Sequence, residues 1–543
     1  MSLQSSSTLL CFALLALAAC SASSPSVAPD ASAPQASATP APAPIAQPAP
    51  SAAPISPTPA AKQPNIIFIL TDDLALADTA FMPKLKTQLT DHGVSFSNYF
   101  VSVSLCCPSR ATILRGQYAH NTGVYGNNLP DGGFEKFVSS GAEKSTIATL
   151  LQSAGYKTML AGKYMNGYPS KSGGDTYIPP GWSEWYSAVQ GNPYAEFDYT
   201  LNENGKLVRY GKKSEDYGTD VYTRKAVDFI QRATRESKPF FVYLGYYAPH
   251  SPATPAPRHE KLFADVKAPR SPSYNEADVS DKPNYIKSLA ALSTREQTRL
   301  DDDYRNRLRS LQAVDDAMET LVTALKQNGQ LENTYIVFTS DNGYHMGEHR
   351  LQQGKQTAYE EDIHLPLFIR GPNIPAGITL DYFAGNIDFA PTFAEIAGAK
   401  IPDFVDGRSL VARWGKNPPT EWRQIYLLMH GNANAQPPRA TPRGTPTAPG
   451  GVNEPDDPQT AQIQGKTAQG IPVFAGLRTK DYTYVEYVTG EKELYDLKAD
   501  PYELQNLAAK ADAQLLKTLA ARLAEMKKCA GASCRASENP VIK

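Results

Sequence analysis

The sequence predicts an α/β fold in which a large, mostly parallel central sheet is flanked by helices. Short apolar runs of strand length, such as NIIFIL (65–70) and TYIVFTS (334–340), are typical of buried parallel strands. Amphipathic stretches alternate with these runs, which indicates strands joined by helices. With 543 residues, 41% of them hydrophobic, the chain is long enough for a large domain and a smaller one.

The elements of the main domain, expected over 64–420, follow this alternation in chain order. Further strands are expected at 156–162, 239–247 and 365–371, and helices at 82–93, 146–155 and 304–325. A short helix is predicted around residues 106–116, because Pro108 suits a first helical turn and Gly116 can end a helix.

A smaller C-terminal α+β subdomain is expected over 421–543. Aromatic or aliphatic residues alternate with polar ones over 473–497, which predicts a short antiparallel sheet. A helix at about 512–528 closes the chain. The stretch 431–470 is rich in Pro, Gly, Thr and Ala and predicts a low-complexity surface loop.

The N-terminus predicts export. Residues 1–20 contain a short apolar run followed by LAAC (17–20), which resembles a bacterial lipoprotein box and predicts a signal peptide cleaved before an acylated Cys20. The Ala/Pro/Ser-rich linker 21–63 suits a semi-rigid tether, although a generic disordered tail is the alternative. We therefore expect a cell-envelope lipoprotein whose lipid anchor at Cys20 holds it to a membrane. Because the first residues lack Lys and Arg, ordinary secretion and no export remain alternatives.

The overall charge excludes one class of partner. The formal net charge is −2 and no basic run resembles a stripe that binds polyanions. We expect no nucleic-acid partner, so function has to be inferred from local sites.

Polar side chains follow four of the expected strands. Asp72 and Asp73 follow the strand at 65–70, and Asp341 and Asn342 follow the strand at 334–340. Because ligands gather beyond the carboxyl ends of strands in open α/β sheets, these side chains could meet at one edge. Each motif alone is a common turn, but their repetition after two buried strands predicts an oxygen-only site for Ca²⁺ or Mg²⁺.

The two other strands end in potential cations. Lys163 follows the strand at 156–162, and His250 follows the strand at 239–247. Next to a metal ion, these groups would favour an anionic substrate in the same cleft.

Two adjacent cysteines precede Pro108 at the predicted helix N-terminus, where the helix dipole favours an anion and a reactive sulfur. A disulfide between Cys106 and Cys107 would be strained. A thiolate phosphatase would need an Arg six residues after the nucleophile, where this chain has Thr112 or Ile113. The remaining interpretation is that one cysteine is modified.

These motifs resemble a known family. CCPSRATILRG (106–116) is similar to the sulfatase signature, and GYKTMLAGKY (155–164) resembles the second sulfatase signature. The resemblance covers about residues 64–510 and implies an alkaline-phosphatase-like fold. Four motifs resemble the N-acetylglucosamine-6-sulfatase and heparan sulfatase branch in particular: GKYMNGY (162–168), NEADVSDKP (275–283), SDNGYHMGEH (340–349) and GEKELYDLKADPYELQNLA (490–508).

The resemblance implies a modified nucleophile and a metal ion. In the family, a formylglycine-generating enzyme oxidises the first signature cysteine, here Cys106, to formylglycine (3-oxoalanine). One hydroxyl of its hydrate attacks sulfur, and the other then drives release of sulfate. The resemblance further implies that Ca²⁺, with Mg²⁺ as the alternative, is bound by Asp72, Asp73, Cys106, Asp341 and Asn342.

The remaining catalytic residues are also carried over by the resemblance. Arg110 matches the residue that holds the hydrate, and Asp341 is placed to help activate it. Lys163, His250 and Lys355 match sulfate-binding positions, and the last two are candidates to protonate the leaving oxygen.

One position departs from the pattern of many arylsulfatases. They have a His two residues after the signature Lys, where this chain has Met165. The base for the elimination step is therefore open, and His345 and His349 are candidates. Asn166 and Tyr168 are candidates for contacts with a sugar.

The other cysteines have expected roles as well. Cys107 occupies the variable position of the signature and is expected to be a buried thiol. Cys529 and Cys534 are the pair left for a small disulfide loop, which fits an oxidising compartment.

These motifs lead us to expect an exported sulfatase that removes sulfate from sulfated sugars, with the 6-O-sulfate of N-acetylglucosamine as the candidate position and aryl sulfates as further substrates. A phosphoesterase of the same superfamily is one alternative. A catalytically inactive glycan-binding surface lipoprotein is the other.

Overall fold

The computed structural model describes residues 63–169, 173–414, 418, 420–432, 452 and 470–541. The predicted signal peptide with Cys20, the predicted linker up to residue 62 and most of the predicted loop 431–470 lie outside the described residues. Residues 61–543 group as one compact unit. No helix among the residues described is both long and apolar enough to cross a membrane.

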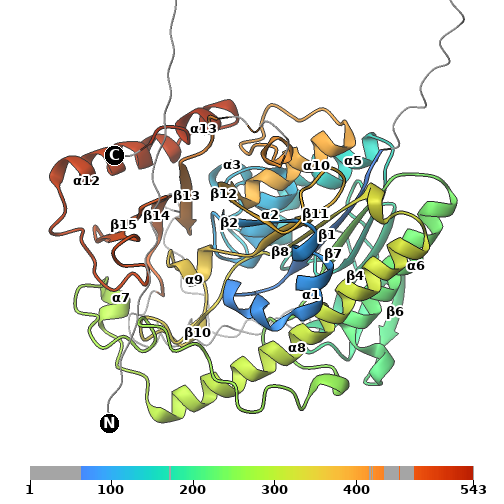
Figure 1. The fold of residues 1–543 in the computed structure, drawn as a ribbon, viewed down its shortest axis with the longest axis horizontal. Coiled ribbons are helices and arrows are strands. Elements are labelled where there is room, and N and C mark those ends of the chain that lie inside the picture. The colour runs from blue at the N-terminus through green and yellow to red at the C-terminus, as the bar shows by residue number, and fades with distance from the viewer. Residues whose placement is uncertain are drawn as a thin grey trace, which may run out of the picture. The chain divides into compact units, whose positions relative to one another are not determined.

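Within these ranges, a ten-stranded sheet forms the centre of the fold (Figure 1). The strand order is β12 (Ile378–Gly385), β2 (Val94–Phe100), β11 (Leu367–Arg370), β8 (Thr334–Ser340), β1 (Asn65–Thr71), β7 (Phe240–Gly245), β3 (Lys157–Gly162), β4 (Glu184–Gly191), β5 (Tyr199–Glu203) and β6 (Lys206–Tyr210). The five strands from β8 to β4 pair in parallel, whereas β11 and β5 run antiparallel to their neighbours. The predicted mostly parallel α/β fold is confirmed.

Strand β1 shows why this sheet needs helices on both faces. All seven of its residues are buried, and successive side chains point to opposite faces. Ile67 and Ile69 belong to one hydrophobic cluster, whereas Ile66, Phe68 and Leu70 belong to another. The Phe68 ring lies 4.9 Å from the ring of Phe389. A continuous apolar run therefore requires a helical layer on each side.

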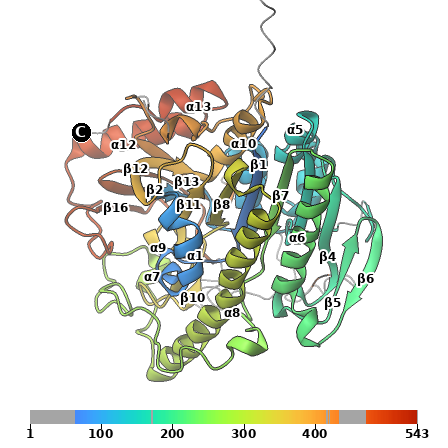
Figure 2. The same ribbon diagram turned by 45° about the vertical axis from the view of Figure 1, so that its right-hand side comes forward.

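The two helical layers come from different parts of the chain (Figure 2). Helices α6 (Gly218–Arg235) and α8 (Thr294–Gln327) contribute to the cluster that contains Ile67. Helices α2 (Cys106–Arg115), α5 (Ile147–Ser153) and α10 (Phe389–Ala397) contribute to the cluster that contains Phe68. The shorter helices are α1 (Pro83–Gln88), α3 (Ala119–Thr122), α4 (Gly133–Ser139), α7 (Asn284–Lys287) and α9 (Glu360–Ile363).

Two predicted helices have different lengths in the structure. The helix expected at 82–93 is α1 followed by a 3₁₀ turn at Thr90–His92. The helix expected at 304–325 begins ten residues earlier as α8, because Ser293 and Glu296 form a capping box there. The first turns of α8 are mostly exposed, so they lack the apolar spacing on which the prediction depended.

Strands β2, β4, β5, β6 and β12 were not predicted. Several of their residues are exposed, as in β6, where no residue is buried, and in the first half of β12. Edge and half-covered strands lack the continuous apolar run that identifies central strands. The strand expected at 365–371 is present as β11.

The C-terminal region contains the expected antiparallel sheet, which in the described residues has four strands, β13 (Ile425–His430), β14 (Phe474–Thr479), β15 (Tyr482–Tyr487) and β16 (Lys492–Asp496). Helix α12 (Ala513–Met526) covers it and α13 (Ala532–Ser537) follows. The Cys529–Cys534 disulfide is present, and Cys107 is a buried thiol. Leu427 and Leu477 share one hydrophobic cluster with Phe100 of the main sheet, and the boundary near residue 420 stays a prediction.

Burial of the Glu196 carboxyl group should make the stability of the protein depend on pH. This buried carboxyl accepts a hydrogen bond from Thr219 N at the start of α6 (2.7 Å), and burial raises its pKa from 4.5 to about 8. The folded state therefore keeps a proton that the unfolded state loses, so stability should fall as pH rises from about 4.5 to about 8, by at most about 5 kcal/mol. Glu196→Gln should remove this dependence. Thermal unfolding of both proteins between pH 5 and 9 checks it, and a Tm difference that does not change with pH would contradict it.

Candidate functional site

The four strand-end motifs meet at one edge of the sheet. Strands β8, β1, β7 and β3 are consecutive neighbours and run parallel, so their carboxyl ends lie side by side. The following segments carry the residues that the sequence analysis selected, which are Asp341 and Asn342, Asp72 and Asp73, His250, and Lys163. All six side chains are buried.

A cluster of possible metal ligands lies at this edge. One ligand atom from each of Asp72, Asp73, Cys106 and His250 lies within 4.8 Å of the others. The Cys106 Sγ is 3.4 Å from Asp72 Oδ1, and His250 Nε2 is 3.5 Å from Asp73 Oδ2. Asn342 joins the cluster by donating from Nδ2 to Asp73 Oδ1 at 2.7 Å.

The backbone at Asp73 explains how two successive aspartates reach the same cluster. Consecutive side chains of a strand point to opposite faces. Asp73 has a positive φ of 65°, which interrupts this alternation directly after β1. Aspartate tolerates this left-handed conformation better than most residues do. The Asp73 amide donates to Asp341 Oδ1 (3.3 Å), which links the ends of β1 and β8.

Each buried carboxylate has a cationic partner. Lys163 Nζ lies 2.5 Å from Asp72 Oδ2, Lys355 Nζ lies 2.6 Å from Asp73 Oδ1, and Arg110 Nε lies 2.7 Å from Asp341 Oδ2. The three carboxylate side chains have no exposed surface. Lys355 Nζ is also 3.0 Å from the Cys106 Sγ.

These charges divide the carboxyl groups into two kinds. Burial opposes ionisation of Asp72 and Asp73, but Lys163 and His250 hold the pKa of Asp72 well below its usual range, and Lys355 and His250 lower the pKa of Asp73. Burial and the negative charge of Asp72 raise the pKa of Asp341. The site thus contains two firmly ionised carboxylates and one that accepts a proton more readily.

Cys106 is the first residue of α2, as predicted, and Gly116 ends the helix with a φ of 68°. The expectation that this position makes the thiol reactive is not supported. Burial and the neighbouring Asp72 raise the pKa of the Cys106 thiol well above its usual value. Removal of water therefore outweighs the helix N-terminus, and the unmodified cysteine is a weak nucleophile.

The donor set fits a hard divalent cation. Asp73 Oδ2 and Asn342 Oδ1 are buried acceptor oxygens without a hydrogen-bond partner among the described residues. Such atoms are costly unless a cation or water satisfies them. Carboxylate and amide oxygens from Asp72, Asp73, Asp341 and Asn342 are suitable ligands for Ca²⁺ or Mg²⁺.

Both candidate histidines for the elimination step are held in pairs with carboxylates. His345 Nδ1 is 2.8 Å from Asp362 Oδ1, and His349 Nδ1 is 2.7 Å from Glu276 Oε2. The metal-ligand cluster around Cys106 contains neither of them. Their assignment to the elimination step therefore gains no support from these contacts.

The candidate sugar-contacting residues lie beside Lys163. Tyr168 lines a small cavity together with Lys163 and Met165. Its hydroxyl donates to Tyr177 O (2.5 Å) and accepts from Trp185 Nε1 (2.7 Å), so its hydrogen bonds stabilise the fold. Asn166 is buried, and its backbone carbonyl oxygen accepts a hydrogen bond from Phe134 N.

Two residues at the site were missed by sequence reasoning. Arg307 of α8 is buried and donates to the carbonyl oxygens of Asp73 and Pro249, so it ties together the ends of β1 and β7. The Tyr194 ring lies 4.7 Å from the His250 ring and 5.0 Å from Lys163 Nζ. The only sequence feature that could have identified Arg307 is that an arginine interrupts the apolar spacing of a helix. No sequence feature distinguishes Tyr194 as a site residue.

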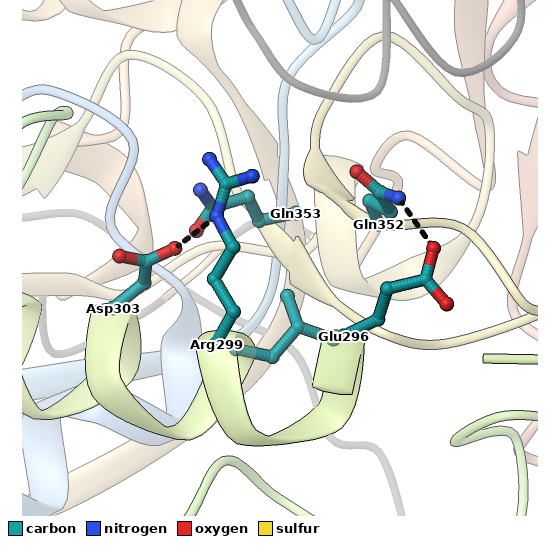
Figure 3. A pocket seen from close by; sticks show the side chains of 6 residues that line it. Glu296, Arg299, Asp303, Gln352 and Gln353 are labelled. Atoms are coloured by element: carbon teal, nitrogen blue, oxygen red, sulfur yellow. Dashed lines mark hydrogen bonds and ion pairs between the residues drawn. The ribbon is translucent and has the colours of Figure 1, made fainter. Parts of the chain in front are cut away.

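A separate polar pocket lies between the first turns of α8 and the strand β10 (Gln353–Gly354), which pairs with β9 (His345–Met346) (Figure 3). Arg299 Nε is 3.6 Å from Asp303 Oδ2, and Gln352 Nε2 donates to Glu296 Oε1 at 3.0 Å. With two carboxylates and one guanidinium, this pocket does not suit a dianion. The cluster around Cys106 is the better candidate site.

Comparisons with known proteins agree with this geometry. Residues 64–399 match the family model described as Sulfatase. The chain is 35% identical over 484 residues to N-acetylglucosamine-6-sulfatase of Homo sapiens, covering 87% of this chain and 86% of that protein. It is 39% identical over 354 residues to the putative extracellular sulfatase Sulf-1 homolog of Caenorhabditis elegans, covering 64% of this chain and about half, 49%, of that relative.

A solved structure is similar over most of the chain. It is BT4656 in complex with its substrate D-glucosamine-2-N,6-O-disulfate, with a TM-score of 0.65 and 26% identity. The similarity covers 86% of this chain and 98% of that one.

Calcium should stabilise the protein through this acidic cluster. After removal of divalent ions with a chelator, Ca²⁺ at 100 times its Kd should raise the free energy of unfolding by about 2.7 kcal/mol. Asp73→Asn should lose most of this gain, whereas the control Asp381→Asn, at an exposed carboxylate, should keep it. Calorimetry with and without Ca²⁺ measures the gain within each variant, and equal gains in both variants would contradict the assignment.

Proposed function

Because the chain belongs to the sulfatase family and is a sulfuric ester hydrolase, we propose that it removes sulfate from sulfated sugars with a modified Cys106 as the nucleophile. The observation that carries this proposal is the position of Cys106. Its sulfur lies 3.4 Å from Asp72 Oδ1 and 3.0 Å from Lys355 Nζ, within a buried cluster of paired charges. Attack on a sulfate ester requires cations that neutralise the sulfate oxygens, and Lys163, Lys355 and Arg110 supply them in this cluster.

The state of the Cys106 thiol supports its conversion to formylglycine. A buried thiol with a raised pKa offers little thiolate for attack on an ester. The sequence CCPSR (106–110) supplies the motif for a formylglycine-generating enzyme. Formylglycine hydrate supplies an oxygen nucleophile and a second hydroxyl whose deprotonation drives release of sulfate.

Ca²⁺, or Mg²⁺ as the alternative, would be bound by Asp72, Asp73, Asp341 and Asn342, with modified Cys106 also in contact. Two buried oxygens without a hydrogen-bond partner among the described residues, Asp73 Oδ2 and Asn342 Oδ1, support this assignment. The cation would supply charge neutralisation for the sulfate group.

Arg110 and Asp341 orient the nucleophile in this proposal. Arg110 donates from Nε to Asp341 Oδ2 and from NH1 to Lys163 O (2.9 Å), so its guanidinium is fixed between the ends of β8 and β3. Asp341 has a raised pKa, which suits a carboxylate that accepts a proton from the attacking hydroxyl.

Lys163, Lys355 and His250 would bind sulfate, and His250 and Lys355 are the candidates to protonate the leaving oxygen. Both lysines pair with carboxylates in the cluster around Cys106, where their ammonium groups would also be in position to contact sulfate oxygens. His250 Nδ1 lies 2.8 Å from Ser251 O, which fixes Nδ1 as the protonated nitrogen because a carbonyl only accepts. Its Nε2 lies 3.5 Å from Asp73 Oδ2 and so faces the cluster around Cys106.

The proposed substrate is a sulfated aminosugar, with 6-O-sulfate of N-acetylglucosamine as the position. The similarity to N-acetylglucosamine-6-sulfatase and to BT4656 bound to D-glucosamine-2-N,6-O-disulfate supports this choice. Export as an envelope lipoprotein anchored through Cys20, or secretion, is also proposed. The disulfide Cys529–Cys534 and the similarity to an extracellular sulfatase homologue support export.

The two adjacent cysteines provide a matched test of the nucleophile. In protein produced together with a formylglycine-generating enzyme, Cys106→Ala should abolish hydrolysis of N-acetylglucosamine 6-sulfate, with a loss of at least about 10³-fold in kcat. Cys107→Ala should keep most of the activity. Sulfate release measured by ion chromatography decides between them, and an active Cys106→Ala variant would overturn the proposed nucleophile.

The role of His250 can be separated from sulfate binding by the choice of leaving group. A sugar alkoxide needs protonation as it leaves, whereas 4-nitrophenolate does not. His250→Gln should therefore lower kcat/KM for the sugar sulfate by about 10²–10⁴-fold and that for 4-nitrophenyl sulfate far less.

Lys163→Met serves as the comparison, because it should lower kcat/KM for the sugar sulfate and for 4-nitrophenyl sulfate by the same factor. Equal losses for the two substrates in His250→Gln would assign proton donation to Lys355 instead.

A further inference from the structure

A second cluster of possible metal ligands lies apart from Cys106. One ligand atom from each of His349, Glu361 and Glu503 lies within 4.8 Å of the others. His349 and Glu503 are almost completely buried, and Glu361 is half-buried. The catalytic proposal uses none of these three residues.

Two atoms of this cluster have no hydrogen-bond partner in the described part of the chain. They are His349 Nε2 and Glu503 Oε1, and both are buried. The other carboxylate oxygen of Glu503 accepts from Glu360 N at 2.9 Å, and the side chain of Thr483 lies near the same carboxyl group. Glu361 Oε1 accepts a long hydrogen bond of 3.3 Å from Ser273 Oγ.

The charges of the cluster are not balanced by protein cations. Neither Glu361 nor Glu503 forms an ion pair with Lys or Arg of the described residues, whereas the adjacent Glu360 pairs with Arg478 (2.5 Å). Burial and the nearby Glu360 and Glu361 raise the pKa of Glu503 well above its usual value. Burial and Glu348 raise the pKa of Glu361 to about 7.

The surroundings of His349 match those of a metal-binding imidazole. Its Nδ1 lies 2.7 Å from Glu276 Oε2, and Glu276 Oε1 lies 3.2 Å from Lys282 Nζ. The carboxyl group of Glu276 is thus an acceptor for Nδ1, which leaves the Nε2 lone pair of His349 available. A carboxylate that orients a ligating imidazole in this way is the usual second layer of a protein metal site.

We propose that His349, Glu361 and Glu503 form a second divalent-metal site, distinct from the oxygen-rich site at Asp72 and Asp73. An imidazole nitrogen with two carboxylates suits a first-row transition metal such as Zn²⁺ or Mn²⁺, whereas Ca²⁺ prefers oxygen ligands alone.

The position of the site indicates a structural role. His349 lies between β9 and β10, six residues before Lys355; Glu361 lies in α9; Glu503 follows β16 of the C-terminal sheet. Figure 1 shows α9 and β10 between the main sheet and the C-terminal strands. A metal ion there ties the C-terminal sheet to the segment that carries Lys355.

Zinc binding to the full chain tests this proposal. After chelator treatment, the protein is loaded with Zn²⁺ in excess Ca²⁺, which occupies the oxygen site, and zinc is counted by mass spectrometry after desalting. We expect one Zn²⁺ per chain and a higher Tm. Glu503→Gln should weaken zinc binding by at least about 10-fold, and Glu276→Gln by about 10–100-fold.

Asp381→Asn is the control. It removes an exposed carboxyl that is outside the three-residue cluster, so zinc affinity should stay within about threefold. Wild-type protein without stoichiometric zinc, or Glu503→Gln that binds zinc like wild type, overturns the proposal.

Should Glu503→Gln not fold, X-ray absorption of zinc-loaded wild type decides the question. One imidazole with oxygen ligands is the expected result. A sulfur ligand would place the zinc at a cysteine, outside the proposed cluster, and overturn the proposal. Neither measurement depends on sulfatase activity.

Discussion

The buried ion pairs of Asp72, Asp73 and Asp341 are the interaction on which the rest of the site depends. Three carboxylates without exposed surface are stable only because Lys163, Lys355 and Arg110 lie against them. These partners come from the segment after β3, the loop after β10, and α2, so the charge pairs also fix how these segments meet the ends of β1 and β8. The same charges hold Asp72 and Asp73 ionised, as cation binding requires.

The sequence predicts the site well because the site follows from topology. Asp72, Lys163, His250 and Asp341 each follow a buried apolar strand, and parallel neighbours bring their carboxyl ends to one edge. Arg307 could not be predicted in the same way, since its hydrogen bonds to two strand-end loops arise from tertiary packing of α8.

The expectation of a reactive thiol at Cys106 gains no support from the structure, for a similar reason. A helix N-terminus can be recognised locally, but the burial that raises the pKa of this thiol depends on the whole fold. His349 gives a related example. Its motif suggested a catalytic base, whereas its hydrogen bond to Glu276 and its proximity to Glu361 and Glu503 support a role in linking the C-terminal sheet to the main body.

The most direct test of the account is mass spectrometry of the peptide that contains Leu105–Arg110, from active protein, together with sulfate release from N-acetylglucosamine 6-sulfate. The account predicts formylglycine at position 106 in the fraction of molecules that turns over substrate. Protein that hydrolyses the ester with an unmodified Cys106 would contradict it.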